Sequence, residues 1–492
     1  MRLHRLCLAA LAIAATTVAA CNSSSTDDPG ATPIEDAGGD SPTDSGVGGE
    51  SGGDAVTTPP IDSGVGDAPD PDAGPRLDPC RGGVAVPTDQ AFVAEGMCAR
   101  VVAQKQGSIR QLTFAPNGDL YGVTTSGNIR RYRDANGDGQ FQSSEIVDWA
   151  NTGGNGNNCH VDSAGGYLYA GSPGGVKRWK WTPDSASGGA GEDLITDQPT
   201  GGHGYHTVHV YDGYLYVHSG SAGNETNDLT PAYDTNRSLL RRFDLSKAPP
   251  WKWADGEVVV VGLRNMIAFK KNAAGRMFGV VNGLDNIHYA GADVHNDNPG
   301  EQMVLLEKGK QYGYPFCFTA QRVTSGGAVM PAGTQLFNED FASPHDDAWC
   351  ASNSSPPATF IQAHSAPMDL AFYDSASSVL PAKWRGGAFI ALHGSWDRSP
   401  STGEKVIWMP FDAASGMPPM PTSTASATTF PYQTVFGGGS VAAGPQDGAW
   451  SWSAGGVSDT PRPVGVAISP VDGALYISSD SGGTIYRLGI KG

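Results

Sequence analysis

The sequence predicts an all-β fold on the strength of three observations. The chain has 492 residues and 67 glycines, and a composition this rich in glycine and turns is typical of one large β domain at this length. Alternating strand patterns around Asn-Gly and Asp-Gly turns recur along the chain, and such turns are strong hairpin signals. No helical periodicity of useful length appears.

Six segments share one plan, in which an apolar strand, a glycine-bearing turn and a second strand follow one another. They are 111–132, 159–179, 207–217, 266–281, 368–411 and 463–488. The early repeats are spaced like propeller blades, and the last two are about twice as far apart, so large insertions are expected there. Six hairpins can also pack as a sandwich, but the common order of strand and turn favours a six-bladed β-propeller over residues 80–492.

The first twenty residues have the pattern of an export signal. A basic start precedes an apolar run over residues 6–20, which is too short to span a membrane as a mature helix. The run ends in Val-Ala-Ala before Cys21, which resembles a bacterial lipobox and implies cleavage before Cys21 and lipid attachment to its thiol. An ordinary signal peptide with a chance cysteine is the alternative. Asn22 favours the outer membrane by analogy, so we expect an envelope protein anchored only by lipid.

Residues 21–79 are predicted to be a disordered acidic linker. Beyond Cys21 they hold 13 acidic residues, one basic residue and almost no large apolar side chain. Burial therefore cannot offset the entropy that ordering would cost. The rest of the chain carries only a small part of the net charge of −18. It has no basic stripe, which argues against a nucleic-acid groove.

Five cysteines follow Cys21, and export makes disulfides possible. Cys80 and Cys98 bracket the entrance to the domain, and Cys317 and Cys350 bracket a loop insertion. We therefore expect these two pairs. Cys159 is left over, and it is expected to be a small buried apolar residue.

Residues 134–145 fit the twelve-position calcium loop of the EF-hand. Oxygen-bearing side chains stand at positions 1, 3, 5 and 12, with glycine at position 6 and an aromatic residue at position 8. The expected ligands are Asp134, Asn136, Asp138, Gln140 and Glu145. No helices are expected around the loop, so the sequence predicts a structural Ca²⁺ clip rather than a switch. The alternative is an acidic turn between strands that holds no metal.

Three histidines, His203, His206 and His209, lead into the third repeat. Imidazole is the side chain best suited to base chemistry near neutral pH. Taken alone, histidines near the start of a strand are more often loop or packing residues. No carboxylate or cysteine at a convincing spacing supports a metal site there.

The order of the motifs resembles the glucose/sorbosone dehydrogenase family, the soluble propellers that use pyrroloquinoline quinone (PQQ). The matching stretches are 201–203, 212–217, 220–224, 264–265, 283–284, 364–367, 393–400 and 462–463. Those at 364–367 and 393–400 resemble the sorbosone dehydrogenase branch. The resemblance covers most of residues 80–492. It implies oxidation of an aldose, a pyranose or a related sugar aldehyde that depends on PQQ and Ca²⁺.

The resemblance also implies roles for individual residues. It aligns His203 with the catalytic base of the family, and His206 is the competing choice because the next segment is one residue shorter. Ser221 stands where the glucose dehydrogenase branch has an aspartate that orients the base. Arg264 and Asn265 match a pair that faces the cofactor, and Arg264 is expected to stabilise charge that develops on a quinone oxygen.

PQQ carries three carboxylates, so its binding requires cations. Arg398, Lys405 and Arg462 are the expected cofactor-binding cations besides Arg264. Gly283 and Leu284 lie where family members offer backbone carbonyls to a Ca²⁺ ion, which polarises the quinone as a Lewis acid. No Cys-x-x-Cys-His haem attachment motif appears, so electrons are expected to leave to a separate acceptor.

Two other functions compete with the dehydrogenase. The stretch after Asn265 is shorter than is usual in the family, which favours a non-catalytic envelope propeller that binds a glycan or a protein. The other alternative is a Ca²⁺-dependent hydrolase of the lactonase type. That chemistry requires side-chain carboxylates around a metal in the central channel, and the sequence offers no convincing set.

Overall fold

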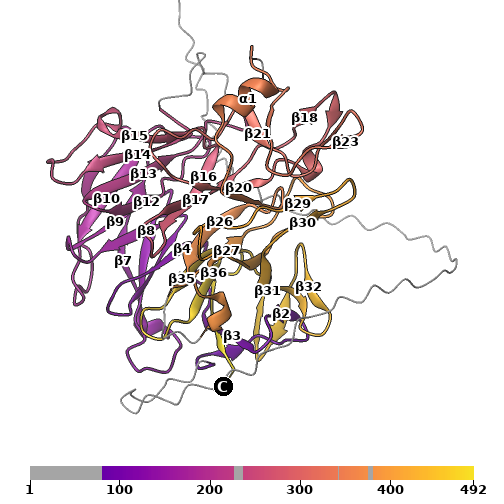
Figure 1. The fold of residues 1–492 in the computed structure, drawn as a ribbon. Helices are drawn as coiled ribbons and strands as arrows, with labels where there is room; N and C mark the ends of the chain where they lie inside the picture. The colour runs from indigo at the N-terminus through magenta and orange to yellow at the C-terminus, as the bar shows by residue number, and fades with distance from the viewer. Residues whose placement is uncertain (1–79, 226–235, 342, 375–379, 492) are drawn as a thin grey trace, which may run out of the picture.

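The computed structural model describes residues 80–225, 236–341, 343–374 and 380–491 (Figure 1). The predicted signal segment 1–20, the linker 21–79 and its lipidation site Cys21 lie outside the described residues. The described part is nearly all β, with one short α-helix, α1 (Asp347–Asn353). No helix in this part has the length and the apolar character needed to cross a bilayer.

Six antiparallel sheets stand around a central axis, so the predicted six-bladed β-propeller is confirmed (Figure 1). Blade one holds β4 (Ile109–Phe114), β5 (Leu120–Thr124), β6 (Asn128–Tyr132) and β7 (Ile146–Asn151), and blade two holds β8 (Cys159–Asp162), β9 (Tyr167–Ser172), β10 (Gly175–Lys180) and β11 (Glu192–Ile195). Blade three holds β12 (Val208–Tyr211), β13 (Tyr214–Ser219), β14 (Leu239–Asp244) and β15 (Glu257–Val261), and blade four holds β16 (Asn265–Lys271), β17 (Met277–Asn282), β20 (Glu301–Leu305) and β25 (Thr359–Ile361).

The last two blades each contain strands from the beginning of the domain. Blade five holds β26 (Pro367–Phe372), β27 (Ala388–Leu392), β28 (Lys405–Met409), β31 (Gln433–Ser440), β32 (Gly444–Gln446) and β2 (Ala91–Val93). Blade six holds β35 (Pro463–Ile468), β36 (Leu475–Ser479), β37 (Thr484–Ile490), β3 (Met97–Ala103) and β1 (Val84–Ala85). Because β2 pairs with β31 and β3 pairs with β37, the start of the domain closes the ring.

The remaining elements are short and lie in the insertions and connections. The small hairpins are β18 (His288–Tyr289) with β19 (Ala292–Asp293), β21 (Cys317–Thr319) with β24 (Gln335–Phe337), β22 (Thr324–Ser325) with β23 (Ala328–Val329), β29 (Thr422–Ser423) with β30 (Thr428–Thr429), and β33 (Trp452–Ala454) with β34 (Val457–Asp459). The 3₁₀ turns are η1 (Ser143–Glu145), η2 (Trp253–Asp255), η3 (His295–Asp297) and η4 (Ala382–Trp384). The large insertions expected around the fifth repeat are therefore present, and α1, β21 and β23 stand beyond the blades in Figure 1.

Both predicted disulfides form. Cys80 is bonded to Cys98, next to the strand that closes the ring, and Cys317 is bonded to Cys350 of α1. Cys159 is a free, buried cysteine, and it packs in an apolar cluster of blades one and two. Burial raises the pKa of its thiol, which fits the small apolar residue that was expected.

The central channel is plugged halfway along its length. The side chain of Gln111 donates hydrogen bonds to the carbonyls of Ile267 (3.0 Å) and Met368 (2.6 Å) on two other inner strands. Ile267, Met368 and Val464 form a small apolar cluster beside these bonds. The plug separates the two mouths of the channel from each other.

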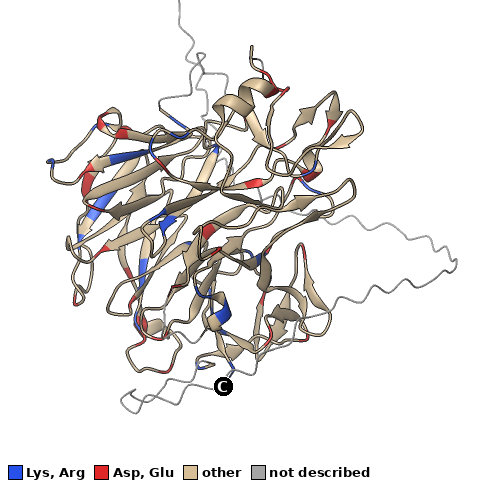
Figure 2. Cartoon of the chain, in the orientation of Figure 1, with Lys and Arg blue, Asp and Glu red and all other residues tan. Residues whose placement is uncertain are grey.

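Charged residues are mixed over the blades rather than gathered by sign (Figure 2). On the outer strands of blades one to three, each arginine of a cross-strand pair contacts a carboxylate. The pairs are Arg130 with Asp148, Arg178 with Glu192 and Arg242 with Glu257. Such surface pairs add little stability, but they neutralise the cations that a polyanion groove would require.

Candidate functional site

Polar side chains gather at the mouth of the channel where the innermost strands begin. In each blade the end of the second strand lies beside the start of the first, because the two form an antiparallel hairpin. Residues from several blades therefore converge here. The residues at or before inner strands are Arg110, His203, Tyr205, Arg264, Asn265, His364 and Arg462, and those at or after the ends of second strands are Ser221, Asn282, His393 and Asp480.

His203 is held in one tautomer by Ser221. The Nδ1 atom of His203 lies 2.8 Å from Ser221 Oγ, and that hydroxyl donates its hydrogen to the carbonyl of Gly223 at 2.7 Å. Since the hydroxyl has only one hydrogen, it must accept the bond from His203 Nδ1–H. The Nε2 atom therefore keeps its lone pair. Ser221 thus orients the His203 ring. By the resemblance, the glucose dehydrogenase branch has an aspartate at this position.

The backbone brings His203 and Arg264 to the same place. The amide of His203 donates to the carbonyl of Ser221 at 2.9 Å, and the amide of Ser221 donates to the carbonyl of Arg264 at 2.8 Å. A Cβ atom at Gly220 would come within 2.6 Å of the Cβ of His203. Glycine is therefore required at this position for the close approach.

The two candidate bases differ in exposure. His203 is partly open to solvent, whereas His206 is only 1% exposed. Burial, assisted by the charge of Arg264, lowers the pKa of His203 well below its usual value. Burial lowers the pKa of His206 to about 4. Both rings are thus neutral at pH 7, but only His203 can be reached from the mouth.

Arg264 lies at the centre of the mouth and is 4% exposed. Its guanidinium contacts Asp285 at 2.6 Å and lines two small cavities. The side-chain oxygens of Asn265 and Asn282 are buried and have no hydrogen-bond partner within the described part of the chain. Buried orphan oxygens are uncommon in native proteins and indicate a place for a ligand or for water.

Asp285, His364 and Asp397 form a group that could hold a cation. One ligand atom of each residue lies within 4.8 Å of the others. The Nε2 atom of His364 is 2.6 Å from the carbonyl of His295 and 3.1 Å from that of Asn298. Carbonyls only accept, so Nε2 carries the hydrogen and Nδ1 is left to face Asp397 at 3.8 Å.

This group could not be recognised from the sequence, in which Asp285, His364 and Asp397 stand far apart and His364 is only part of a family motif. The predicted calcium-binding carbonyls lie next to the group in the chain. Gly283 lines the same cavity as Asp285, and Leu284 lines the neighbouring cavity. Their role as metal ligands stays a prediction.

A second cluster joins Arg462 and His393 to Arg110 and Asp480, which the sequence did not single out. Arg462 lies 3.0 Å from His393 Nδ1, His393 Nε2 lies 2.9 Å from Asp480, and Asp480 also contacts Arg110 at 3.1 Å. Arg110 in turn lies over the ring of Tyr205 at 5.0 Å. Burial alone would raise the pKa of Asp480, but His393, Arg110 and Arg462 hold it well below its usual range. His393 thus links the Arg462 guanidinium to Asp480, and the charges of Arg462 and His393 also act on the nearby Glu404.

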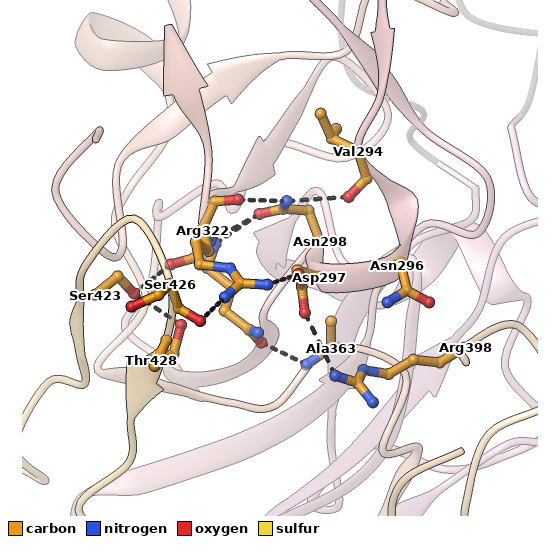
Figure 3. A network of polar contacts seen from close by, with 12 residues as sticks. Val294, Asn296, Asp297, Asn298, Arg322, Ala363, Arg398, Ser423, Ser426 and Thr428 are labelled. Atoms are coloured by element: carbon orange, nitrogen blue, oxygen red, sulfur yellow. Dashed lines mark hydrogen bonds and ion pairs between the residues drawn. The ribbon is translucent and has the colours of Figure 1, made fainter. Parts of the chain in front are cut away.

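Arg398 and Lys405 are not brought to this cluster. Arg398 bonds the carbonyl of Pro400 at 2.5 Å and lies 3.4 Å from Asp297, which Arg322 contacts from the other side (Figure 3). Lys405 is paired with Asp447. Each of these two cations is therefore paired with a carboxylate, and the role of both in cofactor binding stays a prediction.

The predicted calcium loop joins β6 to β7, at the end of blade one away from Arg110. Asp134 accepts a hydrogen bond from the amide five residues on, and Asn136 and Asp138 each accept one from the amide two residues on. Glu145 accepts bonds from amides at both ends of the loop, and Gln140 supplies one of the donor amides. The loop is thus closed by its own side chains, and metal binding there stays a prediction.

Calcium binding to this loop is expected to stabilise the protein. Binding of Ca²⁺ at 100 times its dissociation constant stabilises the folded state by about 2.7 kcal/mol, so the melting temperature of chelator-treated protein should rise on titration. The variant Asp134→Asn should lose most of that rise in calorimetry. Asp148→Asn, which removes an exposed carboxylate of β7, is the matched control. An equal rise in all three proteins would contradict the prediction.

Glu301 lies beside the mouth and predicts a pH effect on stability. It is 4% exposed and accepts a bond from the amide of Gly283 at 2.6 Å, and burial raises its pKa from 4.5 to about 7. Between these values the folded state binds more protons than the unfolded state, so stability falls as pH rises. The cost above pH 7 is about 3 kcal/mol.

Glu301→Gln removes this titration. Its advantage over the wild type in urea denaturation of metal-free protein should be near zero at pH 4.5 and should grow up to about pH 7. Glu307→Gln, an exposed position near the end of the same strand, should show no such trend. A pH-independent difference for Glu301→Gln would refute the assignment.

The fold and this mouth define a six-bladed propeller with a neutral imidazole and a buried arginine at one end of its channel. Residues 91–491 match the family model TrAA12-like, so the chain belongs to the TrAA12-like family. The chain is 26% identical over 325 residues to the pyrroloquinoline quinone-dependent pyranose dehydrogenase of Coprinopsis cinerea, which covers 63% of this chain and 43% of the relative.

Another relative is the pyrroloquinoline quinone-dependent sugar dehydrogenase of Hypocrea jecorina, 28% identical over 289 residues, which covers 56% of this chain and 59% of the relative. The chain therefore spans about half the length of the curated relatives it matches. These names confirm the resemblance to PQQ propellers that the motifs indicated.

Two solved structures share the fold. The calcium structure of the Trichoderma reesei Carbohydrate-Active Enzymes Family AA12 protein has a TM-score of 0.69 and 24% identity, and covers 82% of this chain and 98% of its own. The holo form of the pyranose dehydrogenase PQQ domain from Coprinopsis cinerea has a TM-score of 0.68 and 24% identity, with the same coverage of both chains.

Proposed function

We propose that the protein is a PQQ- and Ca²⁺-dependent dehydrogenase that oxidises an aldose, a pyranose or a related sugar aldehyde. The observation that carries the proposal is the single tautomer of His203, which leaves Nε2 as an unprotonated base beside the buried Arg264. Membership of a family whose curated relatives are named PQQ-dependent sugar dehydrogenases supports it.

The residues of the mouth fit PQQ. Its carboxylates require cations, and Arg110, which contacts Asp480, and Arg462, which contacts His393, supply two. The orphan oxygens of Asn265 and Asn282 are further polar contacts for a bound group. Ca²⁺ would be held by the group of Asp285, His364 and Asp397 or by the predicted carbonyls beside it.

Bound PQQ supplies an electrophilic quinone that accepts a hydride from the sugar. His203 Nε2 takes the proton of the reacting hydroxyl, and its low pKa keeps it unprotonated at neutral pH. Arg264 places a buried positive charge next to the base, where negative charge develops. Trp396 is 51% exposed on the rim of the same cavity and offers an aromatic face to a sugar ring.

Reconstitution tests the proposal. The purified protein is loaded with PQQ and Ca²⁺, and dye reduction is followed with a panel of aldoses. Sugar-dependent reduction is expected, with electrons leaving to a separate acceptor. PQQ uptake without turnover on any sugar would favour the non-catalytic propeller, and hydrolysis of a lactone without PQQ would favour the hydrolase. The proposal also includes an envelope location through a lipid on Cys21. Fatty-acid labelling of cells tests it, because the wild-type protein should take up the label and the Cys21→Ala variant should not.

A further inference from the structure

The opposite mouth of the central channel contains a larger cavity that the proposed function does not use. Its volume is about 490 Å³, within the range of small-ligand sites. Every blade contributes to its wall near the end of its inner strand. The wall includes Phe114, His160, His209, Lys270, Phe372 and Ile468. The plug around Gln111 separates this lower cavity from the mouth that holds His203.

Two histidines face each other in the wall of the lower cavity. The Nδ1 atom of His160 on β8 lies 3.2 Å from the Nδ1 atom of His209 on β12, and the rings meet edge to face at 5.1 Å. In a tetrahedral Zn²⁺ site with Zn–N bonds of about 2.0–2.1 Å, two ligand nitrogens are about 3.3 Å apart. The pair already has the separation that such a metal requires.

The surroundings hold the His209 ring in place but leave its tautomer free. His209 is 5% exposed, and its ring packs against Tyr211 at 5.7 Å and Phe269 at 5.0 Å. Its Nε2 atom has no hydrogen-bond partner among the residues that the structure describes. Metal binding would replace the 3.2 Å hydrogen bond between the two Nδ1 atoms. The ring proton of His209 would then sit on Nε2, and its Nδ1 lone pair would be exposed to the metal.

The charges around the cavity permit a cation. Lys270 is paired with Asp369 at 3.0 Å, and Lys271 is paired with Asp212. Asp374 adds a carboxylate to the wall of the cavity. Both lysines are therefore paired with carboxylates, and the remaining formal charge in the wall is that of Asp374. Besides burial, the charge of Lys270 still lowers the pKa of both histidines.

Protonation of the two imidazole rings competes only weakly with metal binding at neutral pH. Burial lowers the pKa of His160 to about 4, although Asp162 opposes the shift, and burial lowers the pKa of His209 still further below its usual value. Both rings are neutral at pH 7, which is the form that binds metals.

We propose that His160 and His209 form a site for a divalent transition-metal cation, Zn²⁺ or Cu²⁺, with the two Nδ1 atoms as ligands and water from the lower cavity completing the coordination. Imidazole nitrogen favours these cations over Ca²⁺. Because β8 belongs to blade two and β12 to blade three, the bound cation would join two neighbouring blades.

The test uses the full chain, freed of metal with a chelator and then saturated with Ca²⁺ to fill oxygen-ligand sites. Calorimetric titration with Cu²⁺ should show one tight site per chain, and its electron paramagnetic resonance spectrum should show coupling to two nitrogens. In His209→Phe and His160→Gln the coupling should be lost and affinity should fall by more than about 100-fold, since loss of a group that merely orients a ligand already costs about 10–100-fold.

His288→Gln is the matched control, because His288 is an exposed histidine beside Asp340, and it should leave the tight site unchanged. The partly exposed His160 provides a second variant if the substitution of His209 prevents folding, which a thermal melt would reveal. Absence of Cu²⁺ binding in the wild type, or nitrogen coupling that survives in His160→Gln, would overturn the proposal. Neither outcome depends on PQQ or on turnover.

Discussion

The variant His203→Gln is expected to lower kcat by about 10²–10⁴-fold, the usual contribution of a positioned general base, while PQQ remains bound. The physical reason is that Ser221 holds the hydrogen of His203 on Nδ1 and leaves Nε2 unprotonated, and an amide cannot take the proton. Steady-state dye reduction measures kcat, and cofactor absorbance measures PQQ. His206→Gln is the control and should retain kcat; the opposite pattern would assign the base to His206.

The pH profile gives an independent reading of the same base. Burial and Arg264 lower the pKa of His203, so the base stays unprotonated and the acid limb of kcat/KM should lie below pH 6.5. In Ser221→Asp a carboxylate would replace the hydroxyl 2.8 Å from Nδ1 and raise that pKa. The acid limb should then move to higher pH. An acid limb that does not move would show that His203 is not the titrating group.

The second large effect is expected for Arg462→Ala, which should weaken PQQ binding by about 30-fold to several thousand-fold. Loss of one partner from a buried charged contact costs about 2–5 kcal/mol, and Arg462 forms part of the cluster with His393 and Asp480. Titration of PQQ into the protein, followed by quenching of tryptophan fluorescence, measures the change.

Arg398→Ala is the matched control for Arg462→Ala. Its guanidinium contacts Asp297 and the carbonyl of Pro400 rather than the cluster of Arg462, so we expect the PQQ dissociation constant to change by less than about threefold, the ordinary range for an ion pair outside the binding site. If Arg398→Ala weakens PQQ binding more than Arg462→Ala does, Arg398 is the main cofactor-binding cation. The cluster of Arg462, His393 and Asp480 would then lie outside the cofactor site.

Local patterns in the chain were enough to predict the blades. A hairpin depends on residues a few positions apart, so glycine-bearing turns between apolar strands identified all six repeats, three of them with an Asn-Gly or Asp-Gly turn. The loop that contains Asp134 and Glu145 is also closed by local hydrogen bonds, but Ca²⁺ binding there stays a prediction. The disulfide partners were also paired correctly, since each pair brackets a short segment.

The candidate site was only partly predictable. His203 and Arg264 lie in motifs that could be matched along the chain, and both are at the mouth. Arg110 and Asp480 belong to blades one and six, and their contact at 3.1 Å joins residues 370 positions apart. No motif near either residue in the sequence predicts that contact.

The sequence by itself determined the repeating hairpins, the closing disulfides and the likeness to PQQ propellers, because each of these depends on short-range pattern or on motif order. Only the tertiary structure decided which side chains meet in the channel. Arg398 stands five residues after His393 in the sequence, yet it turns to Asp297 in another blade while His393 contacts Asp480. The physical reason is that closure of the ring, and not distance along the chain, brings the ends of strands from different blades together.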